Sequence, residues 1–307
     1  MIPLTTSPEV AAAQAEGRPV VALESTIVTH GLPWPQNLET ARAVEAAVRA
    51  EGAAPATIAV LGGRAHVGLD AARLEALARA TDMAKLSRAD LAARMALLGD
   101  GSTTVAATMI CARLAGIALF ATGGIGGVHR GAERTWDVSA DLDELARTPV
   151  TVVSAGAKAI LDLPRTLEAL ETRGVPVIGW RTDRLPAFWS REAGLPAPLR
   201  MDREADLARA HRLREAMGLG GQLVANPISA EAEIPWAEIA PVIERAQAEA
   251  DAAGVGGKAL TPFLLARVLE ATEGRSLRAN AALIVSNAAL AARIAAALVE
   301  GGGEMDG

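Results

Sequence analysis

Val150-Thr-Val-Val-Ser-Ala-Gly-Ala-Lys158 is the stretch from which the fold of this chain is best predicted. Its first five residues have the β-branched, mostly apolar character of a strand that is covered on both faces. The small residues 155–157 that follow leave room for a ligand close to the backbone. Open α/β sheets bind their ligands just beyond the carboxyl ends of parallel strands, and Lys158 stands at such a position.

Lys158 itself has two interpretations. In the first, partial burial favours the neutral amine, which is then free to attack a carbonyl carbon. In the second, Lys158 is a surface lysine that opens a helix over residues 159–170. The local sequence leaves both interpretations open, since lysines are common after strands.

Apolar runs of strand length alternate with helical patterns along the rest of the chain. The strand-like runs are 19–23, 57–61, 117–122, 150–154, 175–180 and 222–225. This alternation predicts an α/β fold, a three-layer α/β/α architecture around a mainly parallel, mixed central sheet. No break in composition divides the chain, so we expect a single domain over residues 1–307, with 301–307 as a flexible tail.

The composition excludes several classes of function. The chain has 307 residues, of which 50% are hydrophobic and 21% charged, so it has ample material for a large core. Its formal net charge of −6 and aromatic content of 3% argue against a nucleic-acid partner. Charges interrupt the apolar segments, so we expect no membrane span, and no signal peptide is recognised. The single cysteine, Cys111, is expected to be buried packing in a cytoplasmic protein.

Polar residues follow several of the predicted strands. Glu24 comes directly after the strand 19–23; half-buried there, it would favour its protonated form and act as an acid, or else it caps the next turn. Lys85 precedes the start of a helix, where an anion would bind. The loop 99–105, which includes Thr104 and Val105, opens a further helix and is either a phosphate site or an ordinary capped turn.

The loop Thr122-Gly-Gly-Ile-Gly-Gly-Val-His129-Arg130 is the richest in glycine. Four glycines after a strand imply that the backbone bends sharply or approaches another group closely. The spacing is not a dinucleotide fingerprint, and Gly256-Gly-Lys258 is not a Walker loop. His129 is a candidate for contact with a phosphate or a base, whereas His30, His66 and His211 are given structural roles.

Carboxylates recur at short spacing just after this loop. Asp137 and Asp141 offer the oxygen ligands that Mg²⁺ or Mn²⁺ prefers. Alternatively, Ser139 or Asp141 caps the helix that follows. The spacing alone does not establish a metal site.

Taken together, the chain resembles the pseudouridine-5′-phosphate glycosidases, which are grouped with the indigoidine synthase A-like proteins. The resemblance covers nearly the whole chain. Two departures are Ser286-Asn287, where the family usually has Asn-Asn, and Trp180-Arg181, where other residues are expected. The matching stretches are ALESTIVTHGLPWPQN from Ala22, KLSRADL from Lys85, GSTTVAATM from Gly101, ATGGIGGVHRGAERTWDVSADL from Ala121, VVSAGAKAILDLPRTLEAL from Val152, TDRLPAFWSREAGLP from Thr182, VANPI from Val224, TPFLLARVLEATEGRSLRANAAL from Thr261 and SNAALAARIA from Ser286.

The resemblance implies reversible cleavage of the carbon–carbon glycosidic bond of pseudouridine 5′-phosphate to uracil and ribose 5-phosphate. It implies that Lys158 is the nucleophile, forming a Schiff base with the ring-opened sugar, and that Glu24 is the proton donor. Asp137 matches the ligand of a divalent metal, usually Mn²⁺, with Mg²⁺ or another divalent ion as the alternative. It also implies a homotrimer. The positions that match substrate-binding residues are Lys85, Thr104, Val105, His129, Ser139, Ala140, Asp141 and Asn280.

Other classes of function stay open beside this one. An aldolase-like lyase that acts on phosphosugars would share Lys158 and a phosphate site but would not use uracil. A non-catalytic ligand-binding protein of this fold would have an exposed and unreactive Lys158, and a role in the indigoidine pathway is a third alternative. For a phosphorylated substrate, we expect the phosphate to bind Lys85, residues 102–104 and Arg130.

Overall fold

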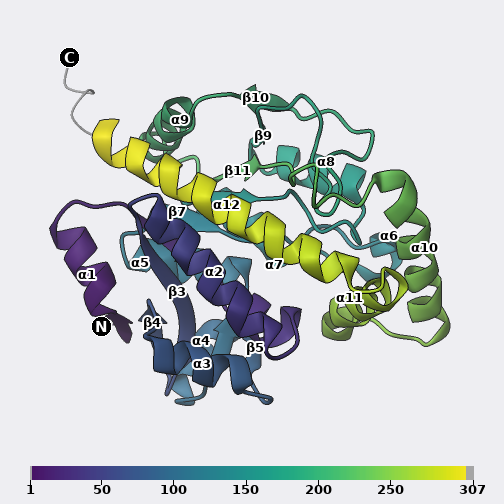
Figure 1. Cartoon of the computed structure of the whole chain (residues 1–307), viewed down its shortest axis with the longest axis horizontal. Helices are drawn as coiled ribbons and strands as arrows, with labels where there is room; N and C mark the ends of the chain where they lie inside the picture. Colours follow the sequence, from purple (N-terminus) through teal and green to yellow (C-terminus); the bar gives the residue numbers. More distant parts are fainter. Residues whose placement is uncertain (1, 302–307) are drawn as a thin grey trace.

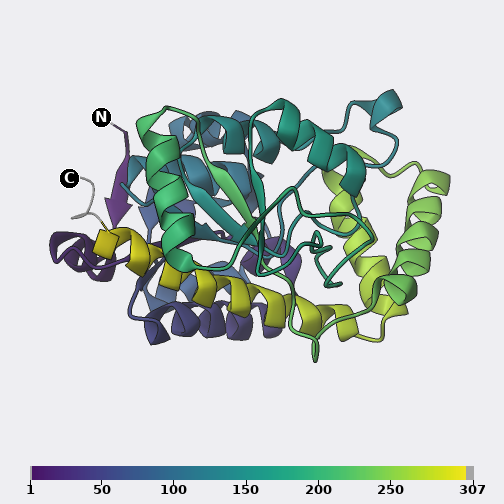
Figure 2. The same ribbon diagram turned by 90° about the horizontal axis from the view of Figure 1, so that it is seen from above.

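A computed structural model describes residues 2–301 of the chain (Figure 1). Its centre is a single sheet of eleven strands with helices on both faces (Figure 2), which confirms the predicted α/β class and its three layers. The strands are β1 (Leu4–Thr6), β2 (Val20–Leu23), β3 (Ala54–Leu61), β4 (Arg64–Val67), β5 (Ala84–Leu86), β6 (Gly101–Thr103), β7 (Leu119–Ala121), β8 (Thr151–Ser154), β9 (Val177–Trp180), β10 (Leu199–Met201) and β11 (Gln222–Ala225).

The strand order is β1-β4-β3-β2-β7-β8-β11-β9-β10, and β6 pairs with both β3 and β5. Only the β3–β4 and β3–β6 pairs are antiparallel, so the sheet is mainly parallel and mixed, as predicted. After β2 the chain continues to β3 on one side, and it later returns to the other side of β2 as β7. This change of direction marks the place where open α/β sheets bind ligands, outside the carboxyl ends of the strands.

The helices form two layers that cover the sheet. The long helix α12 runs along one face with α2 and α9 beside it, whereas α5, α7 and α8 lie on the other (Figures 1 and 2). The helices are α1 (Pro8–Ala15), α2 (Gln36–Ala50), α3 (Ala71–Arg79), α4 (Arg88–Ala96), α5 (Val105–Leu114), α6 (Ala132–Thr135), α7 (Ala140–Arg147), α8 (Leu163–Thr172), α9 (Glu204–Ala216), α10 (Trp236–Ala252), α11 (Leu260–Ala271) and α12 (Arg275–Glu300), with short helical turns η1 (Ile27–Gly31) and η2 (Gly257–Ala259).

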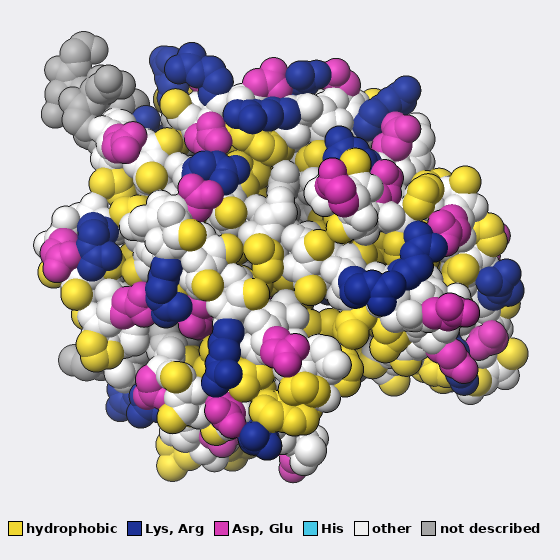
Figure 3. Space-filling model, viewed as in Figure 1, with side chains coloured by type: hydrophobic (Ala, Val, Ile, Leu, Met, Phe, Trp, Pro, Cys, Tyr) yellow, Lys and Arg dark blue, Asp and Glu magenta, His cyan; other side chains and the backbone are white. Residues whose placement is uncertain are grey.

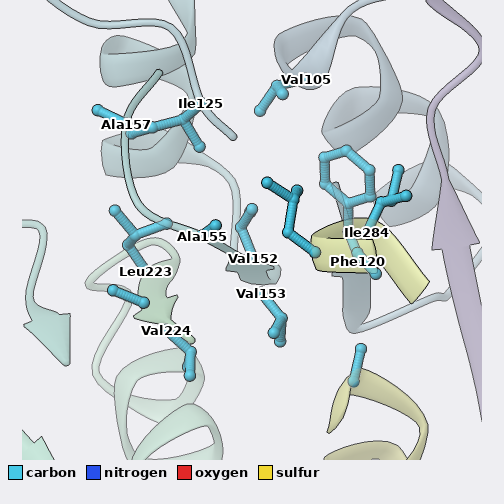
Figure 4. Close-up of a cluster of buried hydrophobic side chains, with 14 of the residues drawn as sticks. Val105, Phe120, Ile125, Val152, Val153, Ala155, Ala157, Leu223, Val224 and Ile284 are labelled. Atoms are coloured by element: carbon cyan, nitrogen blue, oxygen red, sulfur yellow. The ribbon is translucent and has the colours of Figure 1, made fainter. Parts of the chain in front are cut away.

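The strand β8 lies at the centre of the core. All four of its residues are buried, as the β-branched run predicts for a strand covered on both faces. Val152 and Val153 belong to a cluster that includes Phe120 of β7, Val224 of β11 and Ile284 of α12 (Figure 4). Close packing of this kind makes the carboxyl end of β8 a rigid base for the loop that carries Lys158.

One predicted helix start was wrong. The segment after Lys158 is irregular, and α8 begins at Leu163 rather than at residue 159. Asp162 caps α8, because its carboxylate accepts the N–H of Arg165 at 3.1 Å, and Pro164 lies in the first turn, where proline is tolerated. The interpretation of Lys158 as the first residue of a helix is therefore excluded.

The expectation of no membrane span has to be weighed against one helix, α12. Among the described residues, α12 is long and apolar enough to cross a membrane by length and composition alone. Half of its apolar window is buried, and the helix packs along α2, α9, β7 and β8. Packing in the core therefore explains its apolar sequence.

Cys111 behaves as predicted, since it is buried and its burial raises the pKa of the thiol to about 12. The expected flexible tail, 301–307, lies outside the described residues except for Gly301. The assignment of the whole chain to one domain stays a prediction.

Candidate active site

A cavity of about 390 Å³ opens at the carboxyl ends of β2, β7 and β8. Its walls come from the loops after these strands, from residues before α4 and α5, and from α11 and α12. The order of the sheet explains the meeting of distant segments, because β2, β7 and β8 are neighbouring parallel strands. The residues that the resemblance matches to catalytic, substrate-binding or metal-binding positions all line this cavity: Glu24, Lys85, Thr104, Val105, His129, Asp137, Ser139, Ala140, Asp141, Lys158 and Asn280.

Glu24 follows β2 and is held in place at both carboxylate oxygens. Its side chain is buried, with 9% of its surface exposed. The hydroxyl of Thr26 donates to one oxygen and the hydroxyl of Thr122 to the other. Thr122 stands beside Glu24 because Leu23 pairs with Ala121 in the register of β2 and β7. The two hydroxyls fix the orientation of the carboxylate at the edge of the cavity.

Lys158 lies beyond β8 on a loop that is anchored to the glycine-rich loop. Its backbone N–H donates to the carbonyl of Ile125 at 3.1 Å, and Ala157 forms a β-bridge with Ile125. Gly156 turns the chain with φ +84°, a conformation that suits glycine. The Lys158 side chain is half-buried and makes no hydrogen bond or ion pair with another described residue. The Lys158 side chain therefore lines the cavity without a bonded partner among residues 2–301.

Two glycines after β7 are required by close contacts. A Cβ atom on Gly124 would come within 2.7 Å of Cδ2 of Phe188, and one on Gly126 within 2.3 Å of Oγ of Ser139. Contacts this short force a neighbour to move, so only glycine fits at these places. The predicted close approach is thus real, although Phe188 and Ser139 of the chain itself make it.

Asp141 joins the glycine-rich loop to the start of α5. One carboxylate oxygen accepts the N–H of Ala106 at 3.0 Å, and the other accepts the N–H of Gly126 at 2.8 Å. Ser139 is the N-cap of α7, and its hydroxyl accepts the N–H of Asp141 at 3.2 Å. Because Asp141 occupies an amide of the first turn of α5, that turn offers fewer donors to a phosphate than its sequence suggests.

His129 lines the cavity and interacts electrostatically with Asp137 and with the two lysines, Lys85 and Lys158. Its backbone N–H donates to the carbonyl of Asp137 at 3.0 Å. Burial lowers the pKa of His129; the charge of Asp137 opposes this shift, and the charges of Lys158 and Lys85 add to it. The imidazole is therefore expected to be neutral near pH 7, so one ring nitrogen is free to accept a hydrogen bond.

The carboxylates at the cavity do not form a closed metal cage. Among residues 2–301, no group of three or more His, Cys, Asp or Glu side chains is placed to hold an ion. Both oxygens of Asp141 accept backbone N–H groups, which leaves Asp137 as the carboxylate of this loop that is available to an ion. One carboxylate suits a hydrated hard ion such as Mn²⁺ or Mg²⁺, which keeps waters and takes further oxygens from a substrate.

Asn280 of α12 reaches the cavity with a fixed amide orientation. The indole Nε1 of Trp189 donates to Oδ1 of Asn280 at 2.7 Å. Since an indole N–H can only donate, the amide nitrogen of Asn280 points the other way. Asn280 therefore presents a hydrogen-bond donor rather than an acceptor.

Several cavity residues had no recognised role in the sequence. His30 lines the cavity, and its Nδ1 lies 2.6 Å from the hydroxyl oxygen of Thr29. Burial lowers its pKa, and the charge of Lys85 contributes. Its position within the matching stretch from Ala22 was an available signal. Thr261, Pro262 and Leu265 of α11 also line the cavity, but nothing in their composition suggests a site.

The expected phosphate site is only partly realised. Lys85 and Thr104 line the cavity, whereas Ser102, Thr103 and Arg130 are not among its described lining residues. Thr103 is instead buried, and its hydroxyl donates to the carbonyl of Ile58 at 2.7 Å. Its side chain therefore serves the packing of β6 on β3.

The chain is similar to known proteins over nearly its whole length. Residues 9–297 match the family described as indigoidine synthase A like protein. A pseudouridine-5′-phosphate glycosidase of Jannaschia sp. (strain CCS1) is 66% identical over 97% of this chain and 99% of its own, and one of Paracoccus denitrificans (strain Pd 1222) is 68% identical over 95% and 97%.

Two solved structures share the fold. The prealnumycin C-glycosynthase AlnA, in complex with ribulose 5-phosphate, has a TM-score of 0.90 and 43% identity over 97% of each chain. An indigoidine synthase A-like protein from Thermotoga maritima has a TM-score of 0.88 and 35% identity, again over 97% of each chain. The family match and these identities lead to one conclusion: the chain belongs to the indigoidine synthase A-like family.

Proposed function

We propose that the chain is a pseudouridine-5′-phosphate glycosidase, which reversibly converts pseudouridine 5′-phosphate and water into uracil and ribose 5-phosphate. The names of relatives that are 66% and 68% identical over almost the full chain support this activity. The observation that carries the proposal is the shared cavity into which β2 and β8, the strands on either side of β7, bring Glu24 and Lys158.

A nucleophilic lysine makes it possible to break the carbon–carbon bond in this reaction. The bond from C1′ to C5 of uracil has no bridging heteroatom to protonate, so C1′ must first become an electrophile. The bond between C1′ and the ring oxygen breaks, and that oxygen takes a proton. The uncharged amine of Lys158 then adds to C1′, and the new C–N nitrogen loses a proton to Glu24, which restores its lone pair.

The carbon–carbon bond breaks after this addition. A proton goes to C5 of uracil, and the electrons of the C1′–C5 bond return to the pyrimidine ring. The lone pair of the lysine nitrogen forms the C1′=N bond at the same time, which gives an iminium. Water then hydrolyses the iminium, releasing ribose 5-phosphate and restoring Lys158. Glu24, held by Thr26 and Thr122, supplies and removes the protons at the ring oxygen and at C5.

The other cavity residues suit the parts of this substrate. Lys85 and Thr104 stand before helices α4 and α5, where a phosphate is stabilised by nearby amides and positive charge. The amide N–H of Asn280 is oriented to donate, which suits a carbonyl oxygen of uracil. Val105, Ser139, Ala140 and neutral His129 complete the contacts that we propose. A volume of about 390 Å³ is within the usual range for small-molecule sites.

Asp137 would hold the divalent metal, Mn²⁺ in the first instance, with waters and substrate oxygens as its remaining ligands. Such an ion would polarise substrate oxygens and neutralise negative charge. Two residues of the chain would shape the site around the ion. Asp141 holds the glycine-rich loop through the N–H of Gly126, and His129 supplies a neutral imidazole that interacts with Lys158.

The partners that we propose are small molecules rather than nucleic acids. On the face shown in Figure 3, basic and acidic side chains are interspersed, whereas nucleic-acid sites gather basic groups. A cytoplasmic location and a homotrimer stay part of this proposal, and light scattering of the purified protein would measure the latter.

The purified protein should release uracil from pseudouridine 5′-phosphate and, in the reverse direction, form a C-nucleotide from uracil and ribose 5-phosphate. Both reactions are followed by liquid chromatography with mass spectrometry. Uridine 5′-phosphate is the matched control, because its C–N bond leads to a different leaving atom, and we expect it to be cleaved far more slowly. Turnover of phosphosugars without any reaction of uracil would favour an aldolase-like lyase instead.

Replacing Asp137 by asparagine should weaken the effect of Mn²⁺. We expect the chelated wild-type protein to lose activity and regain it with Mn²⁺, whereas the D137N variant should regain little. Binding of Mn²⁺ itself, measured by electron paramagnetic resonance, should weaken about 10-fold or more, as for loss of a ligand of a sparsely held ion. Unchanged Mn²⁺ binding by D137N would remove Asp137 as the ligand.

A further inference from the structure

Asn287 is a buried amide on the apolar face by which α12 packs on the sheet. Only 1% of its surface is exposed, and its neighbours on this face include Leu283, Ile284 and Leu290, all buried. A buried amide without partners destabilises a protein, so its contacts reveal what it does.

The side chain of Asn287 connects the carboxyl ends of two strands. Its Nδ2 donates to the carbonyl of Thr122, just after β7, at 2.8 Å. Its Oδ1 accepts from Nδ2 of Asn226, just after β11, at 2.9 Å. The backbone N–H of Asn226 donates in turn to Ser154 at the end of β8, at 2.8 Å. One amide thus ties α12 to the point where three neighbouring strands release their loops.

Thr122 links this network to the carboxylate of the cavity. The carbonyl of Thr122 accepts from Asn287, while its hydroxyl donates to Glu24. A rotation of the backbone at Thr122 would therefore move the hydroxyl that orients Glu24. Asn287, Asn226 and Thr122 are not among the described residues that line the cavity, so they act on the reaction through residues that do. Two such residues are in contact with the network: Glu24, which Thr122 binds, and Gly123, whose carbonyl lies 3.5 Å from Nδ2 of Asn287.

We propose that Asn287 is a positioning residue for Glu24, acting through the backbone and hydroxyl of Thr122, with Asn226 as its support. The inference rests on the proposed function, because it assigns Glu24 the proton transfers. A purely architectural amide would lower stability and leave the turnover of the folded enzyme unchanged. A positioning residue lowers kcat and leaves KM nearly constant, because substrate contacts are retained.

The test compares N287A with N226A and with L290A. Leu290 is buried on the same helix and has no part in the network, so L290A controls for lost stability. At a temperature where circular dichroism shows all three folded, we expect kcat of N287A to fall about 10- to 100-fold, the scale of a small misplacement of a catalytic group. The kcat of N226A should fall less than that of N287A, and the kcat of L290A should equal that of the wild type.

A double-mutant cycle with T122V decides whether the effect passes through Thr122. Valine removes the hydroxyl and keeps the carbonyl that Asn287 binds. The N287A/T122V protein should be little slower than T122V alone, because both changes release the same carboxylate. Independent effects that multiply, or a kcat of N287A equal to that of L290A, would overturn the inference. The wild type is measured in the same assay. If the proposed function is wrong, the wild type and all variants will be inactive; if only this inference is wrong, the wild type will be active.

Discussion

The K158A variant should bind pseudouridine 5′-phosphate and fail to turn it over. Removing the nucleophile of a covalent mechanism is expected to lower kcat by more than about 10³-fold. Binding should persist, because the substrate contacts proposed for Lys85, Thr104 and Asn280 stay in place around the cavity. Single-turnover kinetics measures the loss of chemistry, and calorimetry measures binding. Appreciable turnover by K158A would contradict the covalent scheme.

Borohydride gives this prediction a second readout. Reduction of the iminium should leave a sugar phosphate covalently bound to the peptide that contains Lys158, located by mass spectrometry. K85A is the matched control, because Lys85 lines the same cavity but belongs to another strand, β5. At saturating substrate K85A should still form the adduct, whereas K158A should form none. An adduct on Lys85 would show that Lys85 is the nucleophile and that Lys158 contacts the substrate in its place.

The sequence predicted the parts of this site that depend on local patterns. The β-branched run before Lys158 identified a buried strand, and the four glycines after Thr122 identified a close approach of the backbone. Strands β5 and β6, three residues each, are too short to show a period, so they are absent from the predicted strands. The start of α8 was misplaced although Asp162 and Pro164 are ordinary start signals.

Contacts between distant segments could not be predicted from local pattern. Thr122 and Glu24 are 98 residues apart, and they meet because β2 and β7 become neighbours in the sheet. The same holds for Asp141, whose carboxylate looked like a metal ligand or a cap of its own helix. It accepts the N–H groups of Ala106 and Gly126 instead, 35 and 15 residues away. The wall formed by α11 gave no signal because its residues are apolar.

The E24Q variant should separate proton transfer from binding. Glutamine keeps the shape of the side chain but cannot deliver a proton, so kcat should fall about 10²- to 10⁴-fold with a small change in KM. E45Q is the matched control: Glu45 is also a buried glutamate held by a threonine hydroxyl, that of Thr57, but it does not line the cavity. Burial raises the pKa of Glu45, so its replacement perturbs a similar environment away from the substrate.

The pH dependence of kcat distinguishes a proton donor from a residue that only shapes the cavity. The profile of the wild type should have a limb that E24Q lacks and E45Q keeps. Exchange of solvent deuterium into C5 of uracil, detected by NMR, should slow in E24Q in proportion to kcat, because the same proton is transferred at C5. A wild-type pH profile in E24Q would show that another group moves the proton, and neutral His129, beside Lys158, would be the next group to replace.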